Sequence, residues 1–393
     1  MSNDAINKKA SQEELSAIRG SVQSLCKEFP GEYWRKLDEK REYPTSFVNA
    51  MTESGFLAAL IPEQYGGAGL GLEAACVILE EIHKNGCNAG ACHAQMYTMG
   101  TILKHGSDEQ KKRWLPKIAS GEIRLQAFGV TEPTSGTDTL SLKTVATKKN
   151  NEYSISGQKI WTSRAEHSDF MVLLARTTPI DKIQKKGKGL SVFMVDMREA
   201  LKEGMTIRPI KTMMNHSSTE VFMDNVKVPE ENLIGEEGNG FKYILDGMNA
   251  ERTLIAAECI GDAQWFINKA TNYAKEREVF GSAIGKNQGV QFPIAKAYAS
   301  YKAADLIVKQ AAIKFDNNDK CAEEANIGKM LAAESAWEAA EACVQTYGGF
   351  AFAEEYDIER KFRETRLYQV APISTNLILA YISQNVLGLP KSY

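Results

Sequence analysis

The sequence lacks the features that would assign it to several broad classes of protein. It contains no run of about 18 or more apolar residues, so no membrane-spanning helix is predicted. Its formal net charge of −3 gives no reason to expect a nucleic acid or an anionic membrane as a partner. Residues 1–15 form neither the apolar core of a signal peptide nor an arginine-rich amphipathic segment. We therefore expect a cytoplasmic protein without a membrane or nucleic-acid partner.

Cysteine is scarce, and its pattern argues against disulfides and metal ions. The seven cysteines are odd in number and scattered, which favours reduced and mostly buried thiols over a disulfide framework. Cys87, Cys92 and His93 are close in sequence, but their spacing matches no common zinc-binding pattern. We therefore expect no metal site.

The remaining composition is that of an ordinary globular protein. Hydrophobic residues make up 43% of the sequence and charged residues 25%. A chain of 393 residues is long enough for two or three domains. The period of the apolar residues changes twice along the chain, which predicts domains at 1–125, 126–235 and 236–393.

The first of these segments has a helical pattern. Leu15, Ile18, Val22 and Leu25 recur at helical spacing within residues 13–29. Similar patterns predict helices over 45–55 and 72–83. Another helix is expected to begin at Ser107, because serine is a good N-cap and acidic residues follow it in the first turn.

The middle segment changes to a period of two. Tyr153, Ile155 and Ile160 alternate with polar residues. Further strands are expected over 170–174, 190–195 and 221–228, so residues 126–235 should form an antiparallel β-barrel or sandwich. Long helical patterns then cover 241–279, 288–317, 322–347 and 371–387, and their short connections predict an antiparallel four-helix bundle. The fold class predicted is α+β.

Residues 131–138 form a loop of small hydroxylated residues that is interrupted by Pro133 and Gly136. Its backbone N–H groups and hydroxyls are available to a flat, phosphate-bearing cofactor, although an ordinary β-turn loop explains the same residues. The glycine-rich turn at 66–69 does not fit the G-x-G-x-x-G fingerprint and lies in no βαβ unit, which argues against a Rossmann site.

This loop and a second segment resemble a paired signature of the flavin-dependent acyl-CoA dehydrogenases. The family carries TEP-x-x-G-S/T-D followed by G-Q-K-x-W-I/T-T/S, and the matching segments here are 131–138 and 157–163. Similar segments at 62–69 and 107–116 extend the resemblance to nearly the whole chain. The resemblance implies an FAD-dependent enzyme that oxidises an acyl-CoA thioester to the trans-2-enoyl-CoA. It also implies a homotetramer, built as a dimer of dimers, that passes electrons to an electron-transferring flavoprotein.

The resemblance also implies which residues contact FAD. Phe128, Val130 and Thr131 would line the isoalloxazine ring, and Thr137 would lie near the pyrophosphate. The remaining implied contacts, several of them to the FAD of a neighbouring subunit, are Trp161, Ser163, Arg277, Phe280, Gln288, Gln345, Gly348, Gly349, Ser374 and Asn376.

The catalytic base is the point at which the sequence departs from many members of the family. Those members carry a glutamate in a C-terminal Y-E-G-T-S-x-I segment, and Pro372 stands at that position here. A minority, including isovaleryl- and long-chain-type enzymes, take the base from an L-x-x-E-R segment on the first bundle helix, which resembles residues 248–252. Glu251 lies at helical spacing among apolar residues, and burial would raise its pKa into a useful range.

The resemblance therefore implies Glu251 as the base and Arg252 as a substrate contact, with Glu258 as a weaker candidate base. The alternatives are a structural ion pair of Glu251 with an arginine or an exposed charge. Since Pro372 has no N–H group, the backbone donor that the family uses on the thioester oxygen is also absent, unless Ile373 replaces it.

Two other functions remain open at this point. One is a same-fold flavoenzyme with different chemistry, namely an acyl-CoA oxidase, a monooxygenase or a desulfinase. The other is a relative that binds DNA or a protein without catalysis, against which the net charge of −3 argues. The length and branching of the acyl chain, the physiological electron acceptor and the pathway do not follow from the sequence.

Overall fold

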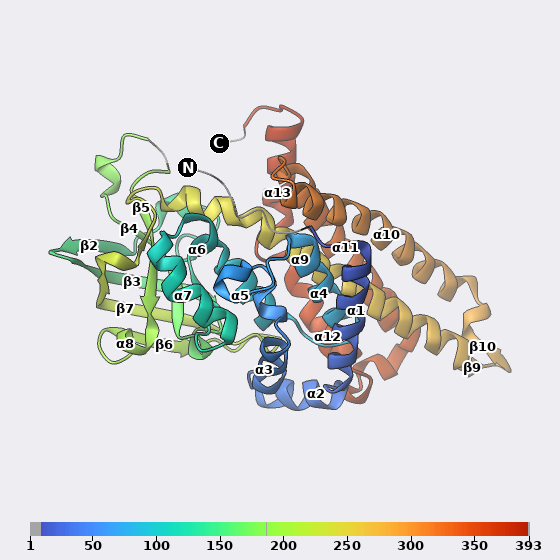
Figure 1. Ribbon diagram of the computed structural model, residues 1–393. Coiled ribbons are helices and arrows are strands. Elements are labelled where there is room, and N and C mark those ends of the chain that lie inside the picture. Colours follow the sequence, from blue (N-terminus) through green and yellow to red (C-terminus); the bar gives the residue numbers. More distant parts are fainter. Residues whose placement is uncertain (1–8, 186, 392–393) are drawn as a thin grey trace. The chain divides into compact units, whose positions relative to one another are not determined.

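The computed structural model describes residues 9–185 and 187–391 and divides into two compact units (Figure 1). The helical unit comprises Met1–Lys40, Leu70–Ala89 and Asn249–Tyr393. The sheet unit comprises Arg41–Gly69 and Gly90–Met248. Each unit is therefore assembled from segments that are distant in the sequence. The three domain boundaries inferred from periodicity stay a prediction.

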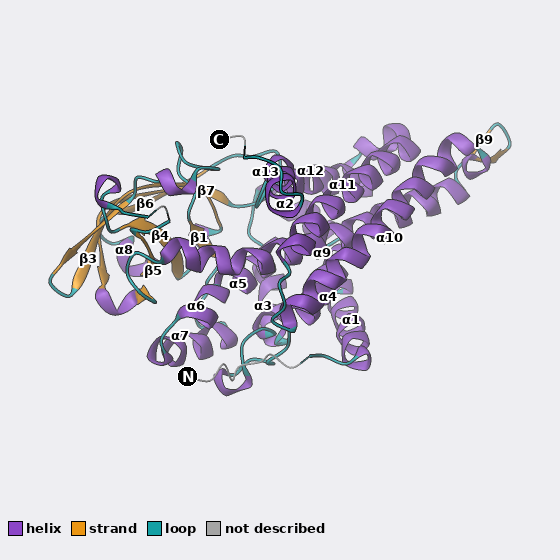
Figure 2. Cartoon of the chain, turned by 90° about the horizontal axis from the view of Figure 1, so that it is seen from above, coloured by secondary structure: helices purple, strands orange, loops and turns teal. Residues whose placement is uncertain are grey.

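The helical unit contains the long helices that the sequence predicts, with differences near the C-terminus (Figure 2). The patterns over 241–279, 288–317 and 322–347 correspond to α9, α10 and α11. The pattern over 371–387 gives only α13 and a following π-helical turn, Ile382–Val386. The helices are α1 (Gln12–Lys27), α2 (Gly31–Lys40), α4 (Leu72–Lys84), α9 (Gly240–Glu276, from residue 249), α10 (Gln288–Asp316), α11 (Ala322–Tyr347), α12 (Ile358–Arg366) and α13 (Thr375–Tyr381).

Hydrogen bonds at the helix ends explain where two of these helices begin. Ser11 and Glu14 form a reciprocal capping box at the start of α1, as Ser–x–x–Glu sequences favour. The residue before α4 is Gly71, which has no side chain with which to cap the helix. The carboxylate of Asp316, at the end of α10, instead accepts the N–H groups of Leu72 and Glu73 at 2.6 and 3.0 Å.

The sheet unit is built on one eight-stranded sheet whose order is β6-β7-β3-β2-β4-β5-β8, with β1 paired to β4. The predicted antiparallel pairing is correct except that β1 runs parallel to β4 and one bridge of β2 to β4 is parallel. The strands are β1 (Ala127–Gly129), β2 (Val145–Lys149), β3 (Glu152–Ser163), β4 (Phe170–Arg176), β5 (Leu190–Asp196), β6 (Met205–Pro209), β7 (Ser218–Pro229) and β8 (Leu233–Ile234).

The helices of the sheet unit come mainly from the segment that precedes the strands. The predicted N-cap is confirmed, because Ser107 and Gln110 form a capping box at the start of α7. These helices are α3 (Thr45–Glu53), α5 (Gly90–Thr98), α6 (Gly100–His105), α7 (Asp108–Ser120) and α8 (Met197–Ala200).

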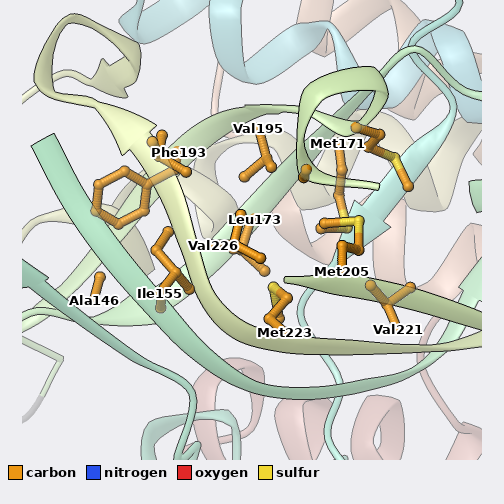
Figure 3. Close-up of a cluster of buried hydrophobic side chains, with 14 of the residues drawn as sticks. Ala146, Ile155, Met171, Leu173, Phe193, Val195, Met205, Val221, Met223 and Val226 are labelled. Atoms are coloured by element: carbon orange, nitrogen blue, oxygen red, sulfur yellow. The ribbon is translucent and has the colours of Figure 1, made fainter. Parts of the chain in front are cut away.

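The core of the sheet unit follows from the alternation of side chains along the strands (Figure 3). Tyr153 and Ile155 of β3 are buried, and the Tyr153 ring meets the edge of Phe193 with centroids 4.8 Å apart. Strand β4 is buried along its whole length, which explains why its sequence is continuously apolar from Phe170 to Ala175 rather than alternating. Figure 3 shows Met171, Leu173 and Val195 directed into the same cluster.

Two absences predicted from the sequence can be compared with the described residues. All seven cysteines lie within the described ranges, and each is a buried thiol rather than part of a disulfide. Within residues 9–185 and 187–391, no helix is both long and apolar enough to cross a membrane.

Gly157, the first residue of the second signature segment, provides a test of the fold. It has a φ of 153°, and an added Cβ atom would lie 2.7 Å from the Thr144 Cα atom. We therefore expect Gly157→Ala to lower the stability by about 1–3 kcal/mol, measured as the shift of the unfolding midpoint. Gly20→Ala is the control, because its added Cβ meets nothing within 4 Å and the residue lies inside α1. It should raise stability by up to about 1 kcal/mol, and equal effects of the two substitutions would contradict this account.

Candidate active site

In the sheet unit, backbone and side-chain hydrogen bonds hold the two signature segments side by side. The N–H group of Ile160 donates to the carbonyl oxygen of Thr131 at 2.9 Å. The ammonium group of Lys159 donates to the carbonyl oxygen of Val130 at 3.1 Å and to Glu132 Oε1 at 2.8 Å. The predicted FAD contacts Val130 and Thr131 are thereby fixed against β3.

Glu132 and Lys159 form a buried ion pair, and neither residue was predicted to have a role. Glu132 also accepts the N–H groups of Lys143 and Thr144 at 2.6 and 2.9 Å. Burial lowers the pKa of Lys159 to about 8, although the Glu132 charge acts in the opposite direction. Burial alone would raise the pKa of Glu132, but Lys159 and the donated hydrogen bonds bring it below its usual value. Both groups are therefore charged at neutral pH. The sequence signal that could have identified this pair is a glutamate in one signature segment and a lysine in the other.

The aromatic residues next to this pair leave an apolar surface that is open to a ligand. Trp161 has a φ of 60° at an irregularity in the pairing of β3 and β7, and its side chain is 56% exposed. Phe128 is half-buried, and its ring meets the edge of Tyr97 with centroids 5.3 Å apart. Ser163 is half-buried at the end of β3, and Thr137 is exposed on the hydroxyl-rich loop. An exposed indole beside backbone and hydroxyl donors fits a planar ring with a phosphate tail.

In the helical unit, the structure distinguishes the two candidate bases on α9. Glu251 is 8% exposed, and no hydrogen bond or ion pair to its carboxylate occurs among the described residues. Burial raises the pKa of Glu251 to about 7, while the charges of Arg252 and Lys329 oppose this shift. Glu258 is fully buried and accepts a hydrogen bond from the Tyr368 hydroxyl at 3.0 Å. Glu258 is thus engaged in an internal contact, whereas Glu251 is not.

Two cations accompany Glu251 without neutralising it through a direct contact. Arg252 is half-buried, and its guanidinium donates to Asn249 Oδ1 at 3.0 Å. Lys329, on α11, is fully buried and donates to the carbonyl oxygens of Tyr368 and Ile373. Lys329 was not predicted as a site residue, because its position inside α11 gives no sign of the segment that it contacts.

The segment containing Pro372 lies between a 3₁₀ turn, Leu367–Gln369, and α13. The Ala371–Pro372 peptide bond is cis. Ser374 is the N-cap of α13, and its hydroxyl accepts the N–H group of Leu377 at 3.4 Å. The N–H group of Ile373 has no hydrogen-bond partner in the described part of the chain. Asn376 is exposed on α13.

The other predicted FAD contacts lie at three places: around the hairpin of β9 (Glu278–Val279) and β10 (Ser282–Ala283) that follows α9 (Figure 1), at the start of α10, and at the end of α11. The Arg277 guanidinium lies 5.8 Å from the ring centroid of Phe350, next to Gly349. Stacking of Tyr273 on Tyr347, with centroids 4.0 Å apart, holds the ends of α9 and α11 together. The predicted contacts here are all exposed to solvent in the single chain: Arg277, Phe280, Gln288, Gln345, Gly348 and Gly349.

The sequence matches family models over three consecutive ranges. Residues 12–122 match the acyl-CoA dehydrogenase N-terminal domain, residues 127–226 the middle domain, and residues 238–386 the C-terminal domain. The acyl-CoA dehydrogenase fadE12 of Mycobacterium bovis is 32% identical over 386 residues, which cover 97% of this chain and 98% of the relative.

Solved structures show the same similarity across the whole chain. One is the glutaryl-coenzyme A dehydrogenase glutaryl-CoA complex, with a TM-score of 0.89, 29% identity, and coverage of 98% of this chain and 97% of the other. Another is described as the electron transferring flavoprotein of Acidaminococcus fermentans, in work on flavin-based electron bifurcation. It has a TM-score of 0.90, 28% identity, and coverage of 96% and 99%.

The Glu132–Lys159 pair can be tested by removing one or both charges. Glu132→Ala leaves the buried Lys159 ammonium without its counter-charge and two backbone N–H groups without their acceptor, so we expect the stability to fall by about 3–5 kcal/mol. The double variant Glu132→Ala, Lys159→Met should be more stable than the single variant, because no unpaired charge stays buried. Unfolding midpoints of the three proteins at pH 7 make the comparison, and a double variant no more stable than the single one would show that the ion pair is not what holds the loop.

Proposed function

This chain belongs to the acyl-CoA dehydrogenase family of FAD-dependent oxidoreductases, and we propose that it oxidises an acyl-CoA to the trans-2-enoyl-CoA with Glu251 as the base. The observation that carries this assignment is a buried carboxylate on α9 that has no internal partner in the described residues. Pro372 supports it, since proline cannot act as a base at the position where many members carry one. The chain would then belong to the subgroup with its base on the first helix of the bundle.

The residues of the sheet unit would hold the flavin ring. FAD, when bound, supplies the acceptor for the hydride that leaves the substrate Cβ atom. Trp161 offers an exposed aromatic face, and Val130 and Thr131 are held next to β3 by Lys159 and Ile160. Phe128, Ser163 and Thr137 complete the proposed set, with Thr137 towards the pyrophosphate. The ion pair beneath this loop keeps the binding surface in place before the cofactor arrives.

Glu251 would remove the α-proton of the acyl group. A base is most effective when its pKa lies near the working pH, and burial brings the pKa of Glu251 to about 7. Both the ionised and the protonated forms of Glu251 are then accessible near neutral pH. Arg252 would contact the substrate, since its guanidinium is bonded to Asn249 rather than to Glu251.

The thioester oxygen needs a hydrogen-bond donor, because negative charge develops on it as the proton leaves. Pro372 cannot donate, as it has no N–H group. The N–H group of Ile373, the next residue, has no partner in the described part of the chain and is the donor that we propose.

We further propose that the protein is a homotetramer in which subunits complete one another's FAD sites. The residues at the hairpin end of the helical unit are exposed in the single chain, and the Phe280 side chain is completely exposed. Phe292 and Leu306 on α10 are 59% and 70% exposed, and clusters of exposed apolar side chains favour burial in an interface. The adenine and pyrophosphate half of FAD would contact Arg277, Phe280, Gln288, Gln345, Gly348 and Gly349 of a neighbouring subunit, with Ser374 and Asn376 as further contacts.

An electron-transferring flavoprotein is the acceptor that we propose for the electrons. The similarity to the structure described as the electron transferring flavoprotein of Acidaminococcus fermentans supports this choice. The alternative, a same-fold oxidase, monooxygenase or desulfinase, is motivated by Pro372 alone.

Anaerobic mixing with a panel of straight and branched acyl-CoAs tests the reaction. We expect one chain class to bleach the flavin absorption band, with a rate that falls as the pH drops below about 7, because protonated Glu251 cannot accept a proton. Glu251→Gln should lower this rate about 10²- to 10⁴-fold while retaining FAD.

Glu276→Gln, an exposed substitution on the same helix, is the control and should keep the wild-type rate. Full activity of Glu251→Gln would exclude this residue as the base. A flavin that no thioester bleaches would favour the non-dehydrogenase chemistries, and rapid oxygen consumption after bleaching would favour an oxidase.

Sedimentation of the FAD-loaded protein tests the assembly. The wild-type protein should sediment as a tetramer, and Phe280→Asp should weaken both the tetramer and FAD retention, because a charge would enter the proposed interface. Leu201→Asp is the matched control, since Leu201 is 48% exposed but lies in the sheet unit. A monomeric wild-type protein that retains FAD would contradict the proposal.

A further inference from the structure

Lys329 is a buried cation that connects α11 to the segment around Pro372. Its side chain is fully buried in the helical unit. The ammonium group donates to the carbonyl oxygen of Tyr368 and, at 2.7 Å, to that of Ile373. These two carbonyls lie on either side of Pro372 in sequence. One side chain therefore fixes both ends of the segment that stands where many relatives carry their base.

Few other hydrogen bonds hold this segment. The N–H groups of Val370 and Ala371 both donate to the carbonyl oxygen of Leu367 at 3.0 Å. The Tyr368 hydroxyl donates to Glu258 on α9. The bond to Ile373 is made at the residue whose N–H group is the proposed donor to the thioester oxygen. Loss of the lysine would leave two carbonyl oxygens without their donor and release that residue.

The charge of Lys329 also acts on Glu251. No carboxylate forms an ion pair with Lys329 among the described residues, so its charge is solvated mainly by carbonyl dipoles. Burial lowers the pKa of Lys329 to about 8, with Cys259 and Glu251 acting to raise it and Arg252 to lower it. Lys329 therefore stays protonated at pH 7, and its positive charge lowers the pKa of Glu251.

The other groups that act on this pair come from α9 and α13. Arg252, like Lys329, favours the ionised form of Glu251. Burial raises the pKa of the Cys259 thiol well above its usual value, so Cys259 is neutral near pH 7. Tyr381 on α13 acts on Arg252 and not directly on Glu251. Lys329 and Arg252 are thus the cations that oppose the effect of burial on the base.

We propose that Lys329 is a positioning residue of the active site, whose ammonium group orients the Tyr368–Ile373 segment through hydrogen bonds and whose buried positive charge acts on the Glu251 carboxylate. The proposal rests on the proposed function in assigning Glu251 as the base. It extends that function by assigning Lys329, which does not react itself, two separable effects. One acts on the Tyr368–Ile373 segment through hydrogen bonds, and the other acts on Glu251 through charge.

Three substitutions separate these effects. Lys329→Gln keeps a hydrogen-bond donor and removes the charge, Lys329→Arg keeps both, and Lys329→Met removes both. The charge of the Glu251 carboxylate is read directly from its infrared carbonyl band, identified by subtracting the spectrum of Glu251→Gln, and titrated with pH. The infrared measurement needs no substrate. If Lys329→Met does not fold, Lys329→Gln alone still tests the effect of the charge.

We expect the wild-type band to titrate near pH 7 and the band of Lys329→Gln to titrate roughly one pH unit higher, because an opposite charge has been removed. Lys329→Met should shift as far, and Lys329→Arg should titrate like the wild type. A Lys329→Gln midpoint equal to that of the wild type would overturn the proposal, as would a Lys329→Arg midpoint shifted as far as that of Lys329→Gln.

The bleaching reaction then separates this proposal from the proposed function. If acyl-CoA bleaches the wild-type flavin, Lys329→Gln should bleach about tenfold more slowly at pH 6 and recover at high pH, since a one-unit shift is a tenfold change in the ionised fraction. Lys329→Met should not recover fully, because its segment has also lost its hydrogen bonds. If no thioester bleaches the flavin, the proposed function fails, while the infrared titration still decides whether Lys329 controls Glu251.

Discussion

The high free-energy cost of burying a charge is the constraint on which both units of this protein depend. In the helical unit, Asp262 is fully buried, and burial alone would raise its pKa, but Lys361 and His83 lower that pKa to about 2. His83 Nε2 accepts the N–H group of Ala89 at 3.0 Å, so Nδ1 carries the proton and donates to Asp262 Oδ1 at 2.8 Å. Thr365 donates to the other oxygen of Asp262. This network joins α4, α9 and α12, and the Glu132–Lys159 pair satisfies the same requirement in the sheet unit.

Glu251 is informative because it does not satisfy this requirement. The Glu251 carboxylate is as buried as many carboxylates that form ion pairs, but it has no partner in the described residues. Burial therefore raises the pKa of Glu251, whereas ion-pair partners lower the pKa of the others. Two cations, Arg252 and Lys329, limit that rise without contacting the carboxylate. A base needs this intermediate condition, since a fully paired carboxylate holds protons too weakly and an isolated one stays protonated at neutral pH.

Much of the fold could be predicted from the sequence, because most elements carry their own local signal. The capping box at Ser107 and the alternation in β3 need no knowledge of the rest of the chain. Helix α12 was missed because Arg360, Lys361 and Glu364 give it the pattern of an exposed helix, although all three are buried. Their burial depends on partners elsewhere, such as the carbonyl oxygen of Gly86, which accepts from Arg360. The parallel pairing of β1 with β4 is likewise a contact that no periodicity within three residues can reveal.

The same distinction applies to the candidate site. Spacing on α9 gave Glu251 and Glu258 the same kind of position, two turns apart on one face. Contacts from distant segments, among them the Tyr368 hydroxyl and His83, distinguish Glu258 from Glu251. The resemblance assigns FAD contacts to the signature residues from the sequence alone, and these contacts stay a prediction. Lys159 holds the 131–138 loop partly through the carbonyl oxygen of Val130, and Lys329 holds the segment around Pro372 through the carbonyl oxygens of Tyr368 and Ile373. Every residue type possesses such a carbonyl oxygen. A lysine that bonds to a carbonyl therefore leaves no mark on the sequence of its partner, and its role becomes visible only when the chain is folded.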